Sequence, residues 1–335
     1  MRIAVDAMGG DHAPEEIVRG VAAGLQYLDD GDEVHLYGVE NRVSRECREH
    51  GLDDPRVTIQ HCPSVIGMEE SPMDAVRRKR DSSVVRMARD AGKGKLDGLI
   101  SAGNTGAFAA ACQLKIKPIK GVSRPGIAVV MPTFHGPALV CDVGANVAPK
   151  PRHLHEYASM CTIYAETILG IQNPEVGLVS IGEEAAKGNQ LVKETRELLA
   201  SDPALHFTGN VEGKDIFAGV SHIFICDGFV GNVVLKLTEG LADGIFKTIV
   251  KEIGAEDPAL KGQFEPIVDR IWKKHDFAEY GGAPLLGINN VAIICHGRSD
   301  YRAVSNAIRV AAEQFRADLN GVIAKRMAPS DEVPV

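Results

Sequence analysis

The sequence has no long run of apolar residues. Its apolar segments are much shorter than the roughly 20 residues that a membrane-spanning helix needs. The N-terminus passes directly into a strand-like segment, Arg2–Asp6, and has no signal peptide pattern. We therefore expect a cytoplasmic protein, and peripheral contact with a membrane stays open as an alternative.

Paired cysteines are also missing. The seven cysteines are scattered and form no Cys-x-x-Cys pair, and several, such as Cys141 and Cys226, lie in apolar runs. This pattern is typical of free, buried thiols and excludes a disulfide framework or a cysteine zinc site. His153 and His155 could together bind a metal ion, but such a pair in a polar segment is more often a surface feature at a helix start. We expect no metal.

The sequence has no excess of positive charge either. It contains 37 Lys and Arg against 45 Asp and Glu, for a net charge of −8. The one dense basic run is Arg77, Arg78, Lys79 and Arg80, and such a run is more often a solvated helix face than a binding patch. Nucleic acid is therefore not an expected partner.

Common nucleotide and hydrolase motifs are absent. The loop GEEAAKGN (182–189) has its lysine before the glycine, the reverse of a P-loop, and AMGGD (7–11) is not a dinucleotide fingerprint. No G-x-S-x-G or H-E-x-x-H occurs. A nucleotide cofactor, a serine hydrolase and a zinc peptidase thus have no support, and we expect no cofactor.

What the sequence does have is a regular alternation of short β-branched runs with helical stretches. Strands are expected at 3–6, 34–39, 57–60, 98–101, 127–131, 139–142, 176–181, 223–226 and 291–295. Helices are expected at 14–28, 74–91, 105–115, 154–169, 191–200 and 301–319. The pattern predicts an α/β protein with a mostly parallel sheet covered on both faces. We expect one domain over residues 1–326 and a disordered tail over 327–335.

Residues 230–279 interrupt this alternation with a predicted long helical hairpin. Apolar residues recur at helical spacing from Val233 to Ile253, and again from Phe264 to Trp272, with a break at 255–258. One interpretation is a helix pair that packs on the body or forms a dimer contact. The other is an arm that touches a membrane, because Trp272 stands beside Arg270, Lys273 and Lys274. The first is favoured, since amphipathic helices most often cover a core.

Glycine, asparagine and threonine gather where the predicted strands end. In parallel sheets, ligands bind beyond the carboxyl ends of the strands, and we expect these loops to share one rim. Backbone N–H groups at such loops and helix starts bind anions, so the rim predicts a phosphate or oxyanion site. Asp142 and Asp227 follow buried strands directly and either orient loops or take part in chemistry. The predicted anion-site residues are Gly9, Gly10, Asp11, Ser101, Asn104, Thr105, Gly106, Asn146, Asp227, Gly281 and Gly282.

Lys187 is unusual among the charged residues, because it lies inside a glycine-rich loop after a predicted strand instead of on a helix face. Its position alone leaves a surface lysine and a functional cation about equally favoured.

Seven motifs, in order, resemble the bacterial phosphate acyltransferase family over residues 2–318: AVDAMGGDHAP, RRKRDSS, SAGNTGA, DVGAN, IGEEAAKGN, CDGFVGNVVLK and YGGAPLLG. The resemblance implies a doubly wound three-layer α/β/α fold, similar to phosphotransacetylases and to the isocitrate dehydrogenase architecture. It implies a homodimer that converts an acyl-acyl-carrier-protein thioester and inorganic phosphate into acyl phosphate. The product would pass to a membrane glycerol-3-phosphate acyltransferase in phospholipid synthesis.

The resemblance also implies roles for two residues. The essential lysine and asparagine of the family correspond to Lys187 and Asn232, through the motifs IGEEAAKGN and DGFVGN. Lys187 would bind phosphate or the developing oxyanion, and Asn232 would donate to the thioester carbonyl. Two alternatives stay open: a dehydrogenase or coenzyme A-dependent phosphotransacetylase on the same fold, and a non-enzymatic scaffold at the membrane.

Overall fold

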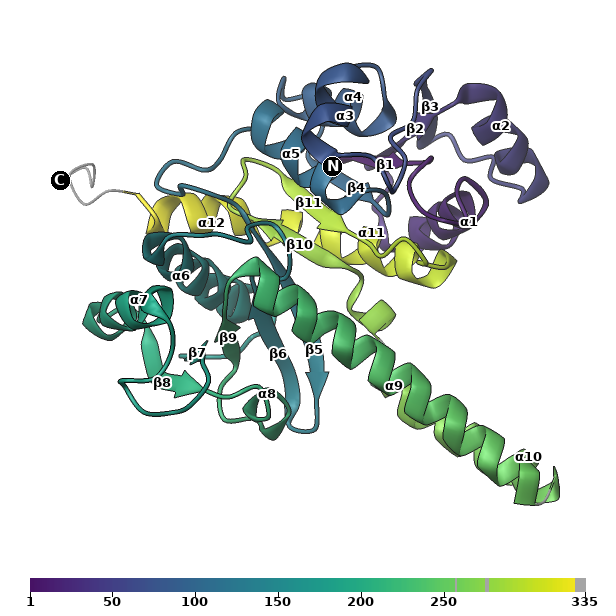
Figure 1. Cartoon of the computed structure of the whole chain (residues 1–335). Helices are drawn as coiled ribbons and strands as arrows, with labels where there is room; N and C mark the ends of the chain where they lie inside the picture. Colours follow the sequence, from purple (N-terminus) through teal and green to yellow (C-terminus); the bar gives the residue numbers. More distant parts are fainter. Residues whose placement is uncertain (257, 275–276, 329–335) are drawn as a thin grey trace.

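The computed structural model describes residues 1–256, 258–274 and 277–328, and its centre is one eleven-stranded sheet (Figure 1). The strand order is β3-β2-β1-β4-β11-β10-β5-β6-β9-β7-β8. The strands are β1 (Arg2–Asp6), β2 (Glu33–Gly38), β3 (Val57–His61), β4 (Gly98–Ser101), β5 (Gly126–Thr133), β6 (Gly136–Cys141), β7 (Glu175–Val179), β8 (His206–Val211), β9 (Ile223–Ile225), β10 (Ala283–Leu286) and β11 (Val291–Ile294).

Helices cover both faces of this sheet, as expected for a doubly wound α/β/α fold (Figure 1). They are α1 (Glu15–Gly24), α2 (Glu40–Glu49), α3 (Pro72–Arg78), α4 (Ser83–Ala91), α5 (Thr105–Lys115), α6 (Pro151–Thr167), α7 (Gln190–Ser201), α8 (Asp215–Ala218), α9 (Gly228–Glu256), α10 (Pro258–Lys274), α11 (Tyr301–Arg316) and α12 (Leu319–Arg326), with short 3-10 helices η1 (Leu25–Tyr27) and η2 (Phe277–Tyr280). The fold class predicted from the sequence is confirmed.

The core consists of three apolar clusters. One lies under α1 and α11, a second under α4 and α5, and the third under α6 in the other half of the sheet. The central strands β4 and β11 are buried along their whole length, which explains their uninterrupted apolar sequences. Burial on both faces fixes the strands and hence the loops at their ends.

Some element boundaries differ from those expected. The single helix expected at 74–91 is two helices, α3 and α4, because Ser82 is extended and starts the second one. Serine residues favour such helix starts over helix interiors. Strands β8 and β10 were not expected: β8 contains Gly209 at a register shift, and β10 has only four residues, one of them proline. Short strands with glycine or proline give no clear period-two pattern.

The sheet contains two parallel groups that run in opposite directions. Strands β1, β2, β3, β4 and β11 are parallel to each other, and β6, β7, β8 and β9 form the other parallel group. The antiparallel pairs β11–β10, β10–β5 and β5–β6 connect them and reverse the direction. The expectation that all strand-end loops share one rim is therefore wrong. We call the carboxyl ends of the β1 group the first edge and those of the β6 group the second edge.

A helical arm formed by α9 and α10 begins at the second edge, passes beside β5 and projects away from the body (Figure 1). The hairpin predicted at residues 230–279 is present, and its break falls between Glu256 and Pro258. Leu237, Leu241, Ile245 and Ile249 are exposed along α9, as are Phe264, Ile267 and Ile271 on α10. We call these seven residues the arm stripe. The Trp272 side chain and the tail from residue 329 onward lie outside the described residues.

Among the described helices, α9 included, none combines the length and the apolar content needed to cross a bilayer.

Candidate active site

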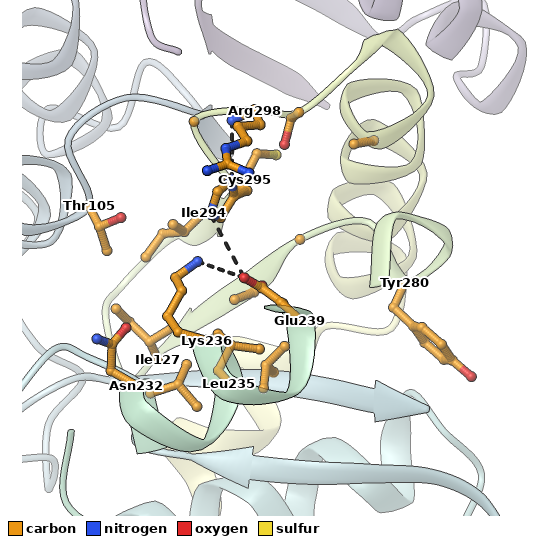
Figure 2. Close-up of a pocket in the computed structure, with 18 of the residues that line it drawn as sticks. Thr105, Ile127, Asn232, Leu235, Lys236, Glu239, Tyr280, Ile294, Cys295 and Arg298 are labelled. Atoms are coloured by element: carbon orange, nitrogen blue, oxygen red, sulfur yellow. Dashed lines mark hydrogen bonds and ion pairs between the residues drawn. The ribbon is translucent and has the colours of Figure 1, made fainter. Parts of the chain in front are cut away.

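A cavity of about 800 Å³ lies between the first edge and the N-terminal half of α9 (Figure 2). Its floor is apolar and belongs mainly to the central strands: Ile127, Val129, Val130, Val143, Leu235, Ala283 and Ile294. Charged and polar residues stand above this floor. A cavity of this size and composition fits a small organic ligand with an apolar part and a polar part.

One helical face of α9 forms the polar wall of the cavity. Asn232, Lys236 and Glu239 line it at spacings of four and three residues, which place side chains on the same side of a helix. The Lys236 Nζ atom lies 2.9 Å from the Glu239 Oε2 atom. The Asn232 side chain is exposed and makes no hydrogen bond to another described residue. The wall thus presents one free amide and one oriented ammonium group.

His296 faces this wall from the loop after β11. Its Nε2 atom lies 3.9 Å from the Glu239 Oε2 atom, and its Nδ1 atom accepts the backbone N–H of Arg298 at 3.2 Å. Burial lowers the pKa of His296 below its usual 6.5, and the nearby positive charge of Lys236 acts in the same direction. His296 is therefore neutral at pH 7, with its proton on Nε2.

Three predicted residues of the first edge line the cavity: Asp11, Thr105 and Gly282. Thr105 stands across the cavity from Asn232 in Figure 2. Gly10 and Gly106 lie in the same loops, and Gly281 immediately precedes Gly282. The predicted loops of the first edge therefore do surround the cavity, but few of their polar side chains line it.

The other predicted polar residues of the first edge hold the loops together. Ser101 Oγ donates to the buried Asp6 carboxylate at 2.8 Å. Asn104 caps α5 by accepting the Ala107 N–H at 3.0 Å. A Cβ atom on Gly9 would lie 2.6 Å from both the Gly103 nitrogen and the carboxylate of Asp6, so only glycine fits where the two loops meet.

Asn146 and Asp227, at the second edge, are likewise used in the scaffold. Asn146 Nδ2 donates to the Pro125 carbonyl at 2.8 Å and to the Tyr157 hydroxyl at 2.7 Å. Asp227 Oδ1 accepts the N–H groups of Phe229 and Val230 at the start of α9. These two residues of the predicted site are therefore structural supports, and Asp227 fixes where α9 begins.

Lys187 lies in the loop between β7 and α7, at the second edge. Its side chain is exposed, does not line the cavity and has no partner among the described residues. Because β7 is the neighbour of β9, this loop borders the one that leads to Asn232. The two residues implied to be essential therefore belong to the same edge, with only Asn232 reaching the cavity.

Two buried aspartates lie at the carboxyl ends of β1 and β6. Asp6 ends β1, and Asp142 follows β6 and accepts N–H groups from Ile127, Gly144, Ala145 and Asn146. Burial raises the pKa of both carboxyl groups. A Cβ atom on Gly231 would lie 1.9 Å from the Asp142 carbonyl oxygen, so α9 packs backbone to backbone on this loop. Asp142 thus positions the wall of the cavity.

Sequence reasoning missed Lys236, Glu239, His296 and Arg298 as cavity residues. A signal for the first two was present, because their spacing from Asn232 matches one helix face. It was hidden because this face lies beside a much stronger apolar pattern, that of the arm stripe.

The described part of the chain contains no group of three or more His, Cys, Asp or Glu residues that could hold a metal ion. The two histidines considered from the sequence have other partners. His153 Nδ1 accepts the Lys150 N–H at 3.0 Å, and His155 Nε2 lies 2.7 Å from Asp202.

Comparison with known proteins gives consistent results. The model of a family described as "Fatty acid synthesis protein" matches residues 1–321. A phosphate acyltransferase from Desulfitobacterium hafniense is 50% identical over 316 residues, which cover 93% of each chain. One from Geobacter sulfurreducens is 44% identical over 330 residues, covering 98% of this chain and 94% of the relative.

Solved structures share the fold at low sequence identity. A phosphotransacetylase from Streptococcus pyogenes aligns with a TM-score of 0.63 and 18% identity, over 94% of each chain. A 4-hydroxythreonine-4-phosphate dehydrogenase from Klebsiella pneumoniae aligns with a TM-score of 0.53 and 11% identity, over 96% of this chain and 99% of the other. These likenesses concern the fold alone. With close relatives matching over nearly its whole length, the chain belongs to the phosphate acyltransferase family.

Proposed function

We propose that this protein transfers a fatty acyl group from an acyl-acyl-carrier-protein thioester to inorganic phosphate, and so supplies acyl phosphate for phospholipid synthesis. The observation that carries the proposal is a cavity with an apolar floor and a polar wall, in a chain of the phosphate acyltransferase family. The floor suits the acyl chain. The wall offers the donors that a phosphate ion and a thioester carbonyl need.

In this reaction a phosphate oxygen attacks the thioester carbonyl carbon, and the carbon–sulfur bond then breaks to release the carrier thiolate, which takes up a proton. Negative charge grows on the carbonyl oxygen in the transition state. Preorganised donors that meet this charge lower the barrier. Asn232 would donate its amide N–H to that oxygen. Lys236, held by Glu239, would supply positive charge for the phosphate ion. Holding both reactants together removes much of the remaining barrier.

Lys187 is proposed as a second cation of the site. Support comes from its place in the motif IGEEAAKGN and from the position of its loop next to the start of α9. Its exposed side chain has no other partner among the described residues, so it is available to an incoming phosphate ion. For Lys187 to act, the loop 182–189 has to move toward the Asn232 end of the cavity when substrate binds.

The arm stripe supports the further proposal that the protein is a homodimer. Two antiparallel helices with an exposed apolar face can pair with the same hairpin of a second copy and bury both faces. Leu237 and Leu241 are 67% and 59% exposed, more than an arm packed on its own body would leave. We propose the dimer as the occupant of the arm stripe. Contact with a membrane surface and with a membrane glycerol-3-phosphate acyltransferase, which would receive the acyl phosphate, is a proposal that rests on the product's chemistry.

Product trapping tests the proposed reaction. A long-chain acyl-carrier thioester and phosphate should give a product that hydroxylamine converts to a hydroxamate, without added divalent metal or NAD. Formation should stop when phosphate is withheld. Hydroxamate formed only from coenzyme A thioesters would favour a phosphotransacetylase instead, and NAD reduction with a hydroxy acid would favour a dehydrogenase. If no thioester is converted, the non-enzymatic scaffold at the membrane would be the remaining alternative.

Sedimentation tests the dimer. Replacing Phe264, Ile267 and Ile271 by Glu should convert the dimer to a monomer, because each charge would be buried at the interface. The matched control replaces the exposed Phe134, Ile181 and Leu198 on the body and should leave the dimer intact. An unchanged dimer in the arm variant, or a wild-type monomer at micromolar concentration, would remove the arm stripe as the interface.

A further inference from the structure

A short segment connects the cavity wall to a cluster of arginines. Met68 lines the cavity, and the side-chain amide of Asn104 holds this stretch of chain by donating to the carbonyls of Gly67, Met68 and Glu70 at 3.0 to 3.2 Å. Helix α3 follows at once, and its first residue, Pro72, packs against the start of α5: a Cβ atom on Gly106 would lie 2.7 Å from the Pro72 ring. The position of α3 is therefore fixed relative to the cavity.

Three arginines at the end of this segment are exposed and form no close ion pair, although the positive charge of Arg78 acts on nearby Glu70 and helps to lower the pKa of that carboxyl group. The side chains of Arg77, Arg78 and Arg80 make no ion pair with any described residue, and the hydrogen bonds of Arg78 and Arg80 go to backbone carbonyls. Lys79, between them, behaves differently: its Nζ atom lies 2.6 Å from Glu70 and 2.7 Å from the Val65 carbonyl. Of these four basic side chains, only that of Lys79 bonds back to the 65–70 stretch of the described chain.

The helix dipole accounts for part of this arrangement. Cations are stabilised in the last turn of a helix, where Arg77 and Arg78 lie. Arg80 follows the end of α3 and gains little from the dipole, yet three like charges stand together on a chain of net charge −8.

Two methionines and a fourth arginine extend the cluster toward the cavity. Met68 and Met73 are 43% and 40% exposed. A Cβ atom on Gly297 would lie 3.0 Å from Met68 Cε, so Arg298, the next residue, stands beside Met68 at the cavity wall. Arginine and methionine are both enriched in protein interfaces. We call Met68, Met73, Arg77, Arg78, Arg80 and Arg298 the arginine patch.

We propose that the arginine patch is the docking surface for the carrier protein, and that the carrier presents carboxylates there around its thioester. This rests on the proposed function. A thioester attached to a carrier can enter the cavity only if the carrier body sits at the cavity mouth, and the arginine patch adjoins that mouth through Met68 and Arg298. Guanidinium groups bind carboxylates through paired N–H donors, which makes arginine suited to an acidic protein face.

Kinetics with two substrates tests this assignment. The variant Arg77→Glu, Arg78→Glu, Arg80→Glu should raise KM for hexadecanoyl-carrier thioester at least about tenfold, with kcat within about twofold, because reversed charge repels the carrier. The free hexadecanoyl-pantetheine thioester needs no docking. The KM of the variant for this substrate, measured as acyl phosphate formation, should therefore equal that of the wild type. In the wild type, KM for the carrier substrate should rise steeply with salt, since exposed charges are screened.

A matched control reverses three exposed lysines: Lys115 and Lys117 at the end of α5 that points away from the cavity, and Lys93 in the turn after α4 that packs against that end. It changes the net charge equally and should leave KM for the carrier substrate unchanged. If the arginine variant folds poorly, replacement of the same three residues by Gln should give the same change in smaller degree.

Three outcomes would overturn the docking role: an unchanged KM for the carrier substrate, an equal loss with both thioesters, or an equal effect in the control. A variant that loses only co-sedimentation with anionic phosphatidylglycerol vesicles would assign the patch to a membrane instead and would also overturn it. Absence of acyl phosphate formation by the wild type would instead contradict the proposed function.

Discussion

Two predicted polar side chains of the first edge, Ser101 and Asn104, are bonded within the protein, whereas two of the second edge, Asn232 and Lys187, remain unpaired among the described residues. Ser101 and Asn104 bond to neighbouring loops, and no free donor is left on either. Asn232 and Lys187 have no hydrogen-bond partner among the described residues. Residues of both kinds occur in glycine-rich motifs, so composition alone does not distinguish a support from a group that meets substrate.

The comparison gives the edges different roles. The first edge provides a rigid boundary of the cavity, and the second edge, with the helix that starts there, provides the donors. Substitutions at the second edge should lower the rate without changing stability. Substitutions at the first edge should mainly lower the free energy of unfolding.

The largest expected effect is a loss of kcat caused by substitutions at the second edge. Lys187→Ala and Asn232→Ala should each lower kcat by about two to three orders of magnitude, as expected when a donor to developing charge is removed. The midpoint of urea unfolding should stay unchanged, because both side chains are exposed. The control Lys193→Ala removes another exposed lysine, on α7, and should retain full activity. Retention of more than about a tenth of the wild-type kcat, a change below about 1.4 kcal/mol of barrier, would falsify the catalytic role of the residue concerned.

The next effect is on stability at the first edge. Asn104→Ala removes a helix cap and three hydrogen bonds to carbonyls of the 67–70 segment, so the free energy of unfolding should fall by about 2 kcal/mol. Asn189 caps α7 in the same way, through the Val192 N–H, but its side chain makes no other hydrogen bond to a described residue. Asn189→Ala should therefore cost only about 1 kcal/mol. Equal losses in urea titrations of the two variants would show that Asn104 acts only as a cap.

A smaller effect is expected at the wall between the two edges. Lys236→Met keeps the length of the side chain and removes its charge, so KM for phosphate should rise about tenfold, equivalent to about 1.4 kcal/mol. Lys251→Met, farther along the same helix and outside the cavity, is the control. If phosphate KM is the same in both variants, Lys236 serves only to hold Glu239.

The smallest effect concerns acidity. Because the pKa of His296 lies below 6.5, acidification adds a proton there only at the acid end of the range. The added charge would face Lys236, Glu239, Arg298 and Asp11, and kcat/KM should decline as the pH falls through this pKa. His296→Gln should remove this acid limb and leave the rate at pH 8 within about threefold. If kcat/KM of the His296→Gln variant still declines at low pH, protonation of another group causes the decline.

The fold was largely predictable because its strands are buried on both faces and its helices are amphipathic. The start of α5 was predicted at the observed residue, since Asn104 and the alanines after it leave little choice. The reversal of strand direction was not predicted. It occurs at the antiparallel pair β5–β6, whereas β10 is antiparallel to both of its neighbours and leaves β11 and β5 running in the same direction. The separation of the candidate site over two edges follows from that one pair of strands.

Sequence reasoning found the loops that surround the cavity but not the state of their side chains. Whether Asn146 is free or bonded depends on Tyr157 and Pro125, whose proximity exists only in the folded chain. Lys236 and Glu239 were hidden for a different reason, since α9 carries two patterns at once, one for the cavity and one for the arm stripe.

This double use of α9 has a mechanical consequence. The helix is anchored at its beginning, where Gly231 touches the Asp142 backbone, and runs unbroken from there to Glu256. At 1.5 Å per residue, Lys236 lies about 7.5 Å from this anchor and the far end of the helix about 37.5 Å, a ratio of about 5. If the helix pivots as a stiff rod on its anchor, about 5 Å of sideways motion at the tip becomes about 1 Å along the helix axis at Lys236. The arm thus scales a large displacement of its tip down to a small one at Lys236. A partner bound to the tip would therefore shift the ammonium group beside the substrate by small amounts.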